Sequence, residues 1–229
     1  MQRKLVLEFT KMNGAGNDFV VIDNRFYHFT DEELGDLARR FCRRRFGIGA
    51  DGLLAFAPAR EAGHHYRMRY LNADGSVGTM CGNGARCLVR FGRHAGVEDE
   101  EVRFESDAGV VRALSPADPA APVRLYLGPP RDYAPEKALA GDHPAAVGPA
   151  HYLWTGTEHL VCFVADAAQT PVAAWGPALR RDEALRPNGA NVDFVEVVDE
   201  RRAADRAVLR VRTFEKGVED ETYACGTGA

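Results

Sequence analysis

The sequence predicts an α/β protein made of two domains that share one plan. Three observations support this: strand-like apolar runs recur along the chain, a proline-rich segment divides it, and each half runs strands into a Cys-Gly-x-Gly element that opens a helical pattern. The dividing segment, residues 115–122, reads Ser-Pro-Ala-Asp-Pro-Ala-Ala-Pro, which is typical of a linker. We therefore expect one domain over residues 1–116 and a second over residues 117–229.

Composition and charge exclude several classes of protein. The chain has 229 residues, which is ample for buried cores, and its 45% hydrophobic and 27% charged residues are typical of a soluble globular protein. A net charge of -4 gives no basic surface for nucleic acid, and no apolar run approaches a membrane span. The first residues carry two cations but lack the apolar stretch of a signal peptide. We expect a cytoplasmic protein.

Apolar periodicity and capping signals place the elements of each half. In the first domain, strands are expected at residues 5–9, 20–23, 53–56, 66–71, 102–105 and 110–114. Thr30 and Glu33 form a capping box that predicts a helix running to the basic residues 43–45, which complement its dipole. In the second domain, strands are expected at residues 123–127, 151–154, 159–164, 192–198 and 208–214, with a helix between residues 175 and 186.

A glycine-rich loop lies at residues 11–19, before the second strand. Gly14 and Gly16 resemble the start of a dinucleotide fingerprint, but the third glycine is absent and a strand rather than a helix follows. This context excludes a dinucleotide site. Asn17 and Asp18 are expected at a tight turn, either as turn residues alone or with Asn17 donating to a ligand.

The five cysteines are predicted to be reduced thiols. Their number is odd and their spacing wide, no Cys-x-x-Cys occurs, and metal-ligand spacing is absent. Three of them are read as small buried apolar residues: Cys42, Cys87 and Cys162. Cys81 and Cys225 differ, because each precedes a glycine-rich helix start. Such a start binds anions and lowers the pKa of a cysteine, so each element predicts a reactive thiol beside a carboxylate-sized anion site.

Two such thiols suit one reaction class. If they face one carbon from opposite sides, one can remove a proton from a stereocentre while the other returns a proton to the opposite face. The helix starts would stabilise the negative charge that develops on the carboxylate of an amino acid. Proton exchange of this kind requires one cysteine as thiolate and the other as thiol.

Five motifs carry a resemblance that covers nearly the whole chain. They are Lys-Met-x-Gly-Ala-Gly-Asn-Asp-Phe (11–19), Asn-Ala-Asp-Gly-Ser (72–76), Met-Cys-Gly-Asn-Gly-x-Arg-Cys (80–87), Asn-Gly-Ala-Asn-Val-x-Phe-Val-Glu (188–196) and Glu-Thr-x-Ala-Cys-Gly-Thr-Gly (221–228). In these residues the chain resembles the diaminopimelate epimerase family of lysine and peptidoglycan precursor synthesis. The resemblance implies an α+β fold of two pseudo-symmetric domains, each a curled mixed β-sheet or barrel around a central helix. The site is expected between them, in a homodimer that uses neither pyridoxal phosphate nor metal.

The resemblance also assigns site residues. Cys81 and Cys225 would be the acid/base pair, with His159 and Glu215 nearby to tune their pKa. The substrate, a small amino acid, would be held by residues of both domains: Asn17, Asn72, Gly82, Asn83, Thr157, Asn191, Glu215, Lys216, Gly226 and Thr227.

The chain departs from the family pattern near the second cysteine. The usual Gly-Asn-Pro-His reads Gly156-Thr157-Glu158-His159, the arginine that usually follows the glutamate is Lys216, and the usual Gly-Val-Gly-Glu-Thr is one residue longer at 217–222. The histidine often found in the first motif is Asn13. These changes concern the distal end of the substrate more than the proton chemistry. Family members continue well past residue 229. Because almost all of the site residues are present, the resemblance favours a truncated product over an inactive remnant.

Three other functions stay open from the sequence. A related epimerase or racemase could act on another amino acid, which Thr157 and Lys216 allow. A duplicated fold without turnover could bind amino acids or serve as a scaffold. A thiol-redox role is the weakest, because a resolving cysteine usually lies closer in sequence.

Overall fold

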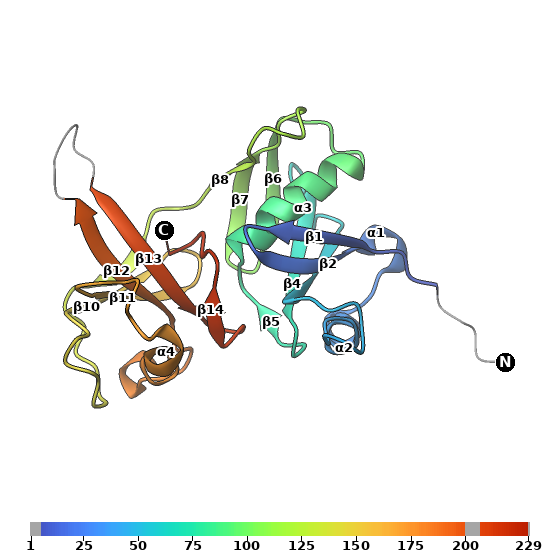
Figure 1. Cartoon of the computed structure of the whole chain (residues 1–229). Helices are drawn as coiled ribbons and strands as arrows, with labels where there is room; N and C mark the ends of the chain where they lie inside the picture. The colour runs from blue at the N-terminus through green and yellow to red at the C-terminus, as the bar shows by residue number, and fades with distance from the viewer. Residues whose placement is uncertain (1–5, 200–206, 229) are drawn as a thin grey trace. The chain divides into compact units, whose positions relative to one another are not determined.

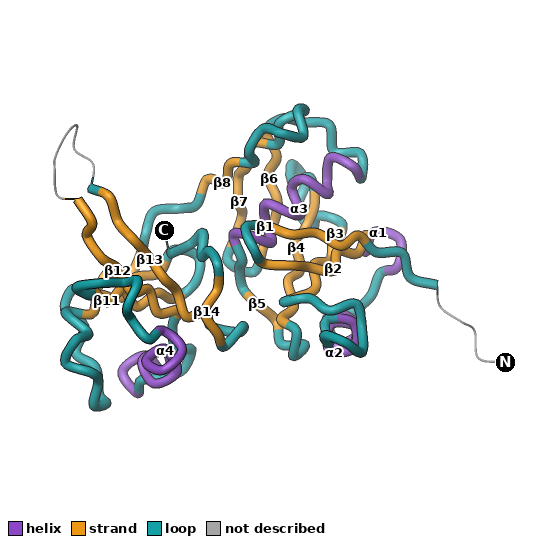
Figure 2. Tube along the Cα trace, in the orientation of Figure 1, coloured by secondary structure: helices purple, strands orange, loops and turns teal. Residues whose placement is uncertain are grey.

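The computed structural model describes residues 6–199 and 207–228, which form two compact units (Figures 1 and 2). The units comprise residues 1–127 and 128–229, whereas the proline-rich segment led us to expect a boundary at residue 116. The difference arises because β8 (Arg124–Tyr126), which follows the proline-rich segment, pairs with β7 (Gly109–Leu114) of the first unit. In the part of the chain described here, no helix has the length and apolar character needed to cross a membrane.

The first unit is built on one curled, mixed sheet of eight strands. Its order is β1-β2-β3-β4-β6-β7-β8, and β5 pairs with β4 outside this path. The pairs β2–β3 and β4–β6 are parallel, and helices lie in the connections between them. The remaining bounds are β1 Thr10–Gly14, β2 Asn17–Asp23, β3 Gly52–Ala57, β4 Tyr66–Asn72, β5 Val77–Gly78 and β6 Glu101–Ser106.

Helices cover both faces of this sheet, which explains the unbroken apolar runs of its central strands. Phe19 and Val21 of β2 pack in one buried cluster with α3 (Gly82–His94), while Val20 and Ile22 pack in a second with α2 (Asp31–Phe41). Because successive side chains of a strand point to opposite faces, the sheet is a layer between α3 and α2 (Figure 1). The short α1 (Asn24–Tyr27) lies in the β2–β3 connection.

The first strand begins later than predicted. The apolar run at residues 5–9 indicated a strand, but its described residues 6–9 are irregular, residue 5 lies outside the described residues, and β1 starts at Thr10. A two-residue turn, Ala15 at φ 53° and Gly16 at φ 97°, sets the hairpin register instead. This turn pairs Gly14 with Asn17, so Asn17 and Asp18 belong to β2 rather than to the turn.

The second unit has a six-stranded sheet of order β14-β13-β12-β11-β10-β9. The pair β11–β12 is parallel, joined through α4 (Val172–Arg180) and a 3₁₀ turn at Glu183–Leu185, and the other pairs are antiparallel. The strands are β9 Arg131–Ala134, β10 Ala150–Trp154, β11 Glu158–Phe163, β12 Asn191–Asp199, β13 Val208–Glu215 and β14 Asp220–Thr222. The four strands predicted after residue 150 are therefore confirmed, whereas the strand predicted at 123–127 is β8 of the first unit.

The residues after β14 do not begin a helix within the described range. Gly226, Thr227 and Gly228 form a turn, in which the Gly228 N–H donates to the Cys225 carbonyl at 3.3 Å. Residue 229, the last of the predicted helix start, lies outside the described residues.

Candidate active site

Cys81 caps the N-terminus of α3. The residue has extended dihedrals (φ −135°, ψ 115°), and its Sγ accepts a hydrogen bond from the Gly84 N–H at 3.4 Å. Gly82, Asn83 and Gly84 of the first turn are all buried. The first N–H groups of a helix lack intrahelical partners, and the positive end of the helix dipole favours negative charge there. Cys81 therefore lies at the helix start that the sequence predicts, and the anion site beside it stays a prediction.

β1 passes close to this helix start because Gly14 has no side chain. A Cβ at Gly14 would lie 2.7 Å from the Asn83 carbonyl oxygen and 2.9 Å from Cys87 Sγ, both closer than a carbon atom tolerates. Cys87 is itself buried, and burial raises the pKa of its thiol to about 11. The glycine therefore serves close packing against α3 and not a dinucleotide.

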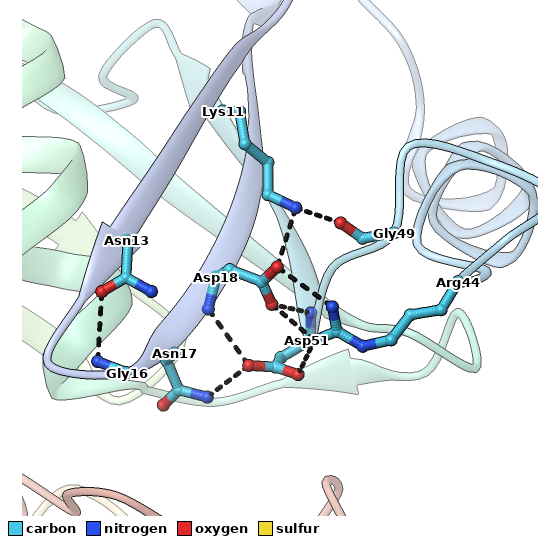
Figure 3. Close-up of polar contacts among 8 residues, drawn as sticks. All are labelled: Lys11, Asn13, Gly16, Asn17, Asp18, Arg44, Gly49 and Asp51. Atoms are coloured by element: carbon cyan, nitrogen blue, oxygen red, sulfur yellow. Dashed lines mark hydrogen bonds and ion pairs between the residues drawn. The ribbon is translucent and has the colours of Figure 1, made fainter.

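Two asparagines near Cys81 are held in a directional hydrogen-bond chain. Asn17 Nδ2 donates to Asp51 Oδ2 at 2.9 Å, and Asn83 Nδ2 donates to Asn17 Oδ1 at 2.9 Å. Arg86 donates to Asn83 Oδ1 at 2.6 Å. Because a carboxylate only accepts and a guanidinium only donates, the two ends fix which way each amide faces. Figure 3 shows the Asn17–Asp51 end of this chain.

Asp51 belongs to a charge network that the sequence analysis missed. Arg44 donates to Asp51 Oδ1 at 2.8 Å and to Asp18 Oδ1 at 2.7 Å, and Lys11 Nζ donates to Asp18 Oδ2 at 2.8 Å (Figure 3). Burial alone would raise the pKa of Asp18, but the bonds and charges of Arg44 and Lys11 lower it to about 2. Arg44 therefore supports the Asn17 site, although the basic run containing it was interpreted as a complement to the helix dipole.

Asn72 lies at the same end of this sheet as Asn17. It closes β4 opposite Gly52, the first residue of β3, and Gly52 in turn pairs with Phe19 of β2. Its Nδ2 donates to Ser76 Oγ at 2.9 Å within the turn before β5. The first unit thus gathers Cys81, Gly82, Asn83 and Asn17 at the start of α3, while Asn72 lies in a turn of its own.

In the second unit, a buried histidine joins Asp193 to the turn that carries Cys225. His159 Nδ1 lies 2.7 Å from Asp193 Oδ2, its Nε2 lies 2.9 Å from Thr227 Oγ1, and Cys225 Sγ lies 3.5 Å from the same oxygen. Because a carboxylate only accepts, His159 Nδ1 donates to Asp193. The Thr227 hydroxyl can both donate and accept, so it links His159 Nε2 to the Cys225 thiol and gives a continuous path for a proton.

Asp193 was not predicted as a site residue. It lies two residues after Asn191 on β12, so both side chains share a face, and Asn191 pairs in register with His159. Asp193 Oδ1 also accepts from Thr213 Oγ1 at 2.7 Å. The sequence signal was the alternation of polar Asn191 and Asp193 with apolar residues at the start of a strand whose first five residues, 191–195, are all buried.

Cys225 has a high pKa, contrary to the low value that a helix start predicts. Burial raises the pKa of the thiol to about 12, together with the negative charges of Glu215 and Asp193, and the Thr227 hydroxyl and Gly228 N–H only partly oppose this. The described turn offers no full helix dipole that would favour a thiolate. Cys225 is therefore a protonated thiol at neutral pH.

The other predicted residues of this unit surround an ion pair. Lys216 Nζ bonds Glu158, the Thr157 hydroxyl donates to the same carboxylate at 3.2 Å, and Lys216 N–H donates to Asn191 Oδ1 at 2.8 Å. Glu215 precedes Lys216 at the end of β13 and contributes its charge to Cys225.

One cluster of the described residues has the composition of a metal site. His159, Asp193 and Cys225 each offer one ligand atom, and these atoms all lie within 4.8 Å of one another. His159 and Asp193 are already hydrogen-bonded to each other at 2.7 Å, so these polar atoms are satisfied as a proton path. The same arrangement needs no metal to account for it.

Comparison with solved structures identifies the fold. A hydroxyproline epimerase from Agrobacterium vitis matches 99% of this chain and 75% of its own at a TM-score of 0.68 and 17% identity. A probable proline racemase from Agrobacterium radiobacter K84 matches 97% of this chain and 74% of its own at a TM-score of 0.65 and 18% identity. The fold is thus the α+β fold of these racemase-like proteins, here with a cysteine at each of two Cys-Gly-x-Gly elements.

Sequence comparison identifies the family. The diaminopimelate epimerase family profile matches residues 9–132 and 151–229. The diaminopimelate epimerase of Aquifex aeolicus is 39% identical over 234 residues, 97% of this chain and 78% of that protein. That of Chlorobaculum tepidum is 41% identical over 219 residues, 95% of this chain and 78% of that protein. The chain belongs to the diaminopimelate epimerase family, a family of isomerases.

Proposed function

We propose that this chain interconverts LL- and meso-2,6-diaminopimelate by proton exchange at one α-carbon, with Cys81 and Cys225 as the two acid/base residues. Membership of the family supports the substrate and the reaction. The observation that carries the mechanism is the hydrogen-bonded path from Cys225 through Thr227 to His159, because a thiol that exchanges protons with substrate needs such a connection.

The two cysteines take different protonation states in this proposal. Cys225 is the thiol, as its raised pKa requires, and Cys81 at the start of α3 is the thiolate. The Cys81 thiolate removes the α-proton, the electron pair of the C–H bond spreads onto the carboxylate, and Cys225 delivers its proton to the opposite face. The cysteines finish with exchanged protonation states, and the reverse reaction restores them.

The N–H groups at the start of α3 are the proposed stabilisers of the developing charge. Gly82 and Asn83 present these groups next to Cys81, and in the second unit Gly226 and Thr227 hold the carboxylate from their turn. Removal of one preorganised donor of this kind costs about 3–4 kcal/mol of transition-state stabilisation. Asn17, Asn72, Thr157 and Asn191 are the proposed contacts to the rest of the substrate. The family resemblance further supports a cytoplasmic homodimer that works without pyridoxal phosphate.

A second candidate is epimerisation of another amino acid in the same site. It is favoured by the pairing of Lys216 with Glu158, because a lysine already bonded to a carboxylate recognises a ligand differently from an arginine fork. A panel of amino acids, followed by α-hydrogen exchange, separates the two candidates.

The proposal is tested by incubating the purified chain with LL-diaminopimelate in deuterium oxide and following α-hydrogen loss and meso formation by NMR. Exchange together with inversion is the expected result. Cys81→Ala should lose both and keep carboxylate binding, because the α3 N–H groups remain. Absence of exchange and inversion in the wild-type chain overturns the proposal, and normal epimerisation by Cys81→Ala overturns the role of Cys81.

A further inference from the structure

The proton path of the second unit brings three kinds of metal ligand together. His159, Asp193 and Cys225 each offer one donor atom, and these three atoms all lie within 4.8 Å of one another. Zinc lies about 2.0–2.3 Å from each nitrogen, oxygen or sulfur ligand, so donors that share one zinc ion are roughly 3–4 Å apart. The cluster therefore has to contract by about 1 Å to hold such an ion. Cys225 is the half-buried member of the three, so this shift falls on its thiol.

Hydrogen bonds already orient the two buried donors. His159 Nδ1 donates to Asp193 Oδ2 at 2.7 Å, and its Nε2 lies 2.9 Å from Thr227 Oγ1. Whichever ring nitrogen binds a metal, the other keeps a partner that fixes the plane of the imidazole. Asp193 Oδ1 accepts from Thr213 Oγ1 at 2.7 Å, which holds the carboxylate in the same way. Without a cation these bonds satisfy the cluster, and around a cation they would orient its ligands.

The charge around Cys225 favours a cation. Burial raises the pKa of this thiol, and the negative charges of Glu215 and Asp193 raise it further. Negative charges that oppose a thiolate attract a divalent ion, and the charge of the ion then stabilises the thiolate that it binds. Lys216 follows Glu215 in sequence, but its Nζ is bonded to Glu158. The electrostatics of the second unit thus agree with the donor set of the cluster.

We propose that His159, Asp193 and Cys225 are the ligands of an inhibitory site for a thiophilic divalent cation such as Zn²⁺. An imidazole, a carboxylate and a thiolate together suit zinc, whereas Mg²⁺ prefers oxygen ligands. On binding, a Zn–S bond replaces the S–H bond of Cys225, and the proton leaves to water. The sulfur then has no proton to deliver to a substrate. The binding of the cation stands by itself, and only the inhibition rests on the proposed function.

The test uses Co²⁺ as a spectroscopic substitute for Zn²⁺, because a Co²⁺–thiolate bond absorbs in the near ultraviolet and a Zn²⁺–thiolate bond does not. Titration of the purified chain with Co²⁺ should produce this absorption band, and Zn²⁺, which binds such sites more tightly, should abolish it. Cys225→Ser should lose the band. Asp193→Asn, which keeps the shape of the side chain, should weaken Co²⁺ binding roughly tenfold to hundredfold.

Cys81→Ala is the matched control, because it removes the thiol of the first unit and leaves the cluster intact. This variant should keep both the Co²⁺ band and the affinity. If Cys225→Ser loses its cooperative thermal transition, alkylation of the wild-type chain by iodoacetamide is measured instead. Zn²⁺ should then protect Cys225 and leave the alkylation rate of Cys81 unchanged, and mass spectrometry of the digested chain reads the two sites separately.

In the epimerisation assay, Zn²⁺ should abolish the inversion of LL-diaminopimelate, a chelator should restore it, and Mg²⁺ should have no effect. The inference is overturned by an unchanged band in Cys225→Ser, by loss of the band in Cys81→Ala, or by alkylation of Cys225 that Zn²⁺ does not slow. Full inversion with Zn²⁺ bound overturns the inhibitory role. The failure of the proposed function looks different: the metal-free wild-type chain then shows no epimerisation, although the Co²⁺ band is present.

Discussion

Replacing Thr227 by valine tests the proton path of the second unit most directly. The change keeps the shape of the side chain and removes one hydroxyl, which lies 2.9 Å from His159 Nε2 and 3.5 Å from Cys225 Sγ. The Thr227 carbonyl, which accepts from Thr155 Oγ1 at 2.6 Å, is unaffected, so the turn itself should persist. The variant therefore separates the hydroxyl from the backbone that carries it.

The expected cost in stability follows from the buried nitrogen that loses its partner. His159 is 1% exposed, and after the change the long contact of 3.4 Å to Asn191 Nδ2 is the one its Nε2 keeps among the described residues. A buried polar atom that has lost its partner costs about 1–3 kcal/mol. Each kcal/mol lowers the melting temperature of a unit of about 100 residues, such as the second unit, by roughly 4–8 °C. Differential scanning calorimetry measures this loss.

The change is expected to slow inversion of the substrate more than deuterium exchange at its α-carbon. The hydroxyl lowers the pKa of Cys225, so its removal raises that pKa further and slows proton transfer on this side. Inversion should fall roughly 10- to 100-fold, at or below the usual contribution of a positioned acid or base. Deuterium exchange that starts at Cys81 should fall less, so the ratio of exchange to inversion rises.

Thr170→Val is the matched control for this prediction. Thr170 is also buried and also donates a hydroxyl hydrogen bond, to the Asp166 carbonyl at 2.8 Å, but it has no contact with the path to Cys225. This control should lose stability and keep the ratio of exchange to inversion. The reasoning is refuted if Thr227→Val inverts diaminopimelate at the wild-type rate, or if both variants change the ratio alike.

Three further predictions concern the first unit. Asp51→Ala removes the acceptor that orients the Asn17 amide, so the KM for diaminopimelate should rise roughly tenfold. Asp51→Asn keeps an acceptor oxygen and should restore part of this loss. Equal kinetics for the two variants would contradict an orienting role. Gly14→Ala should cost about 1–3 kcal/mol in urea unfolding because its Cβ meets Asn83 and Cys87, whereas Gly128→Ala, whose Cβ meets nothing within 4 Å, should not. Asp18 has a pKa lowered from 3.8 to about 2, so its contribution to stability is complete above pH 4 and is lost as the pH falls towards 2. Arg44→Gln should flatten this loss in acid thermal melts, and an unchanged acid profile would show that Arg44 does not stabilise the carboxylate.

Local signals predicted the elements that depend on neighbouring residues. The capping box at Thr30 and Glu33 is present with both of its hydrogen bonds, and Cys81 caps the helix that the glycines following it predicted. In both cases the atoms that interact lie within four residues of one another, so the sequence contains the whole interaction. The apolar runs of β2 and β3 likewise identified strands that are covered on both faces.

Long-range pairing could not be predicted in the same way. Asn17 meets Asp51 and His159 meets Asp193 across 34 residues in each case, and no periodicity relates such partners. The strand after the proline-rich segment has too few residues to show which sheet it joins, and the pairing of Arg112 with Tyr126 decides it. The start of β1 was missed because two residues with positive φ, rather than apolar alternation, fix the register.

The amide chain of the first unit and the histidine path of the second differ in whether a proton can move along them. Asn17 and Asn83 are amides whose dipoles point in one direction, from the Asp51 carboxylate to the Arg86 guanidinium. The path of the second unit runs through the Thr227 hydroxyl and the His159 ring, groups that can both donate and accept hydrogen bonds. The first unit therefore surrounds its cysteine with dipoles of fixed direction, whereas the second joins its cysteine to groups that can pass a proton on.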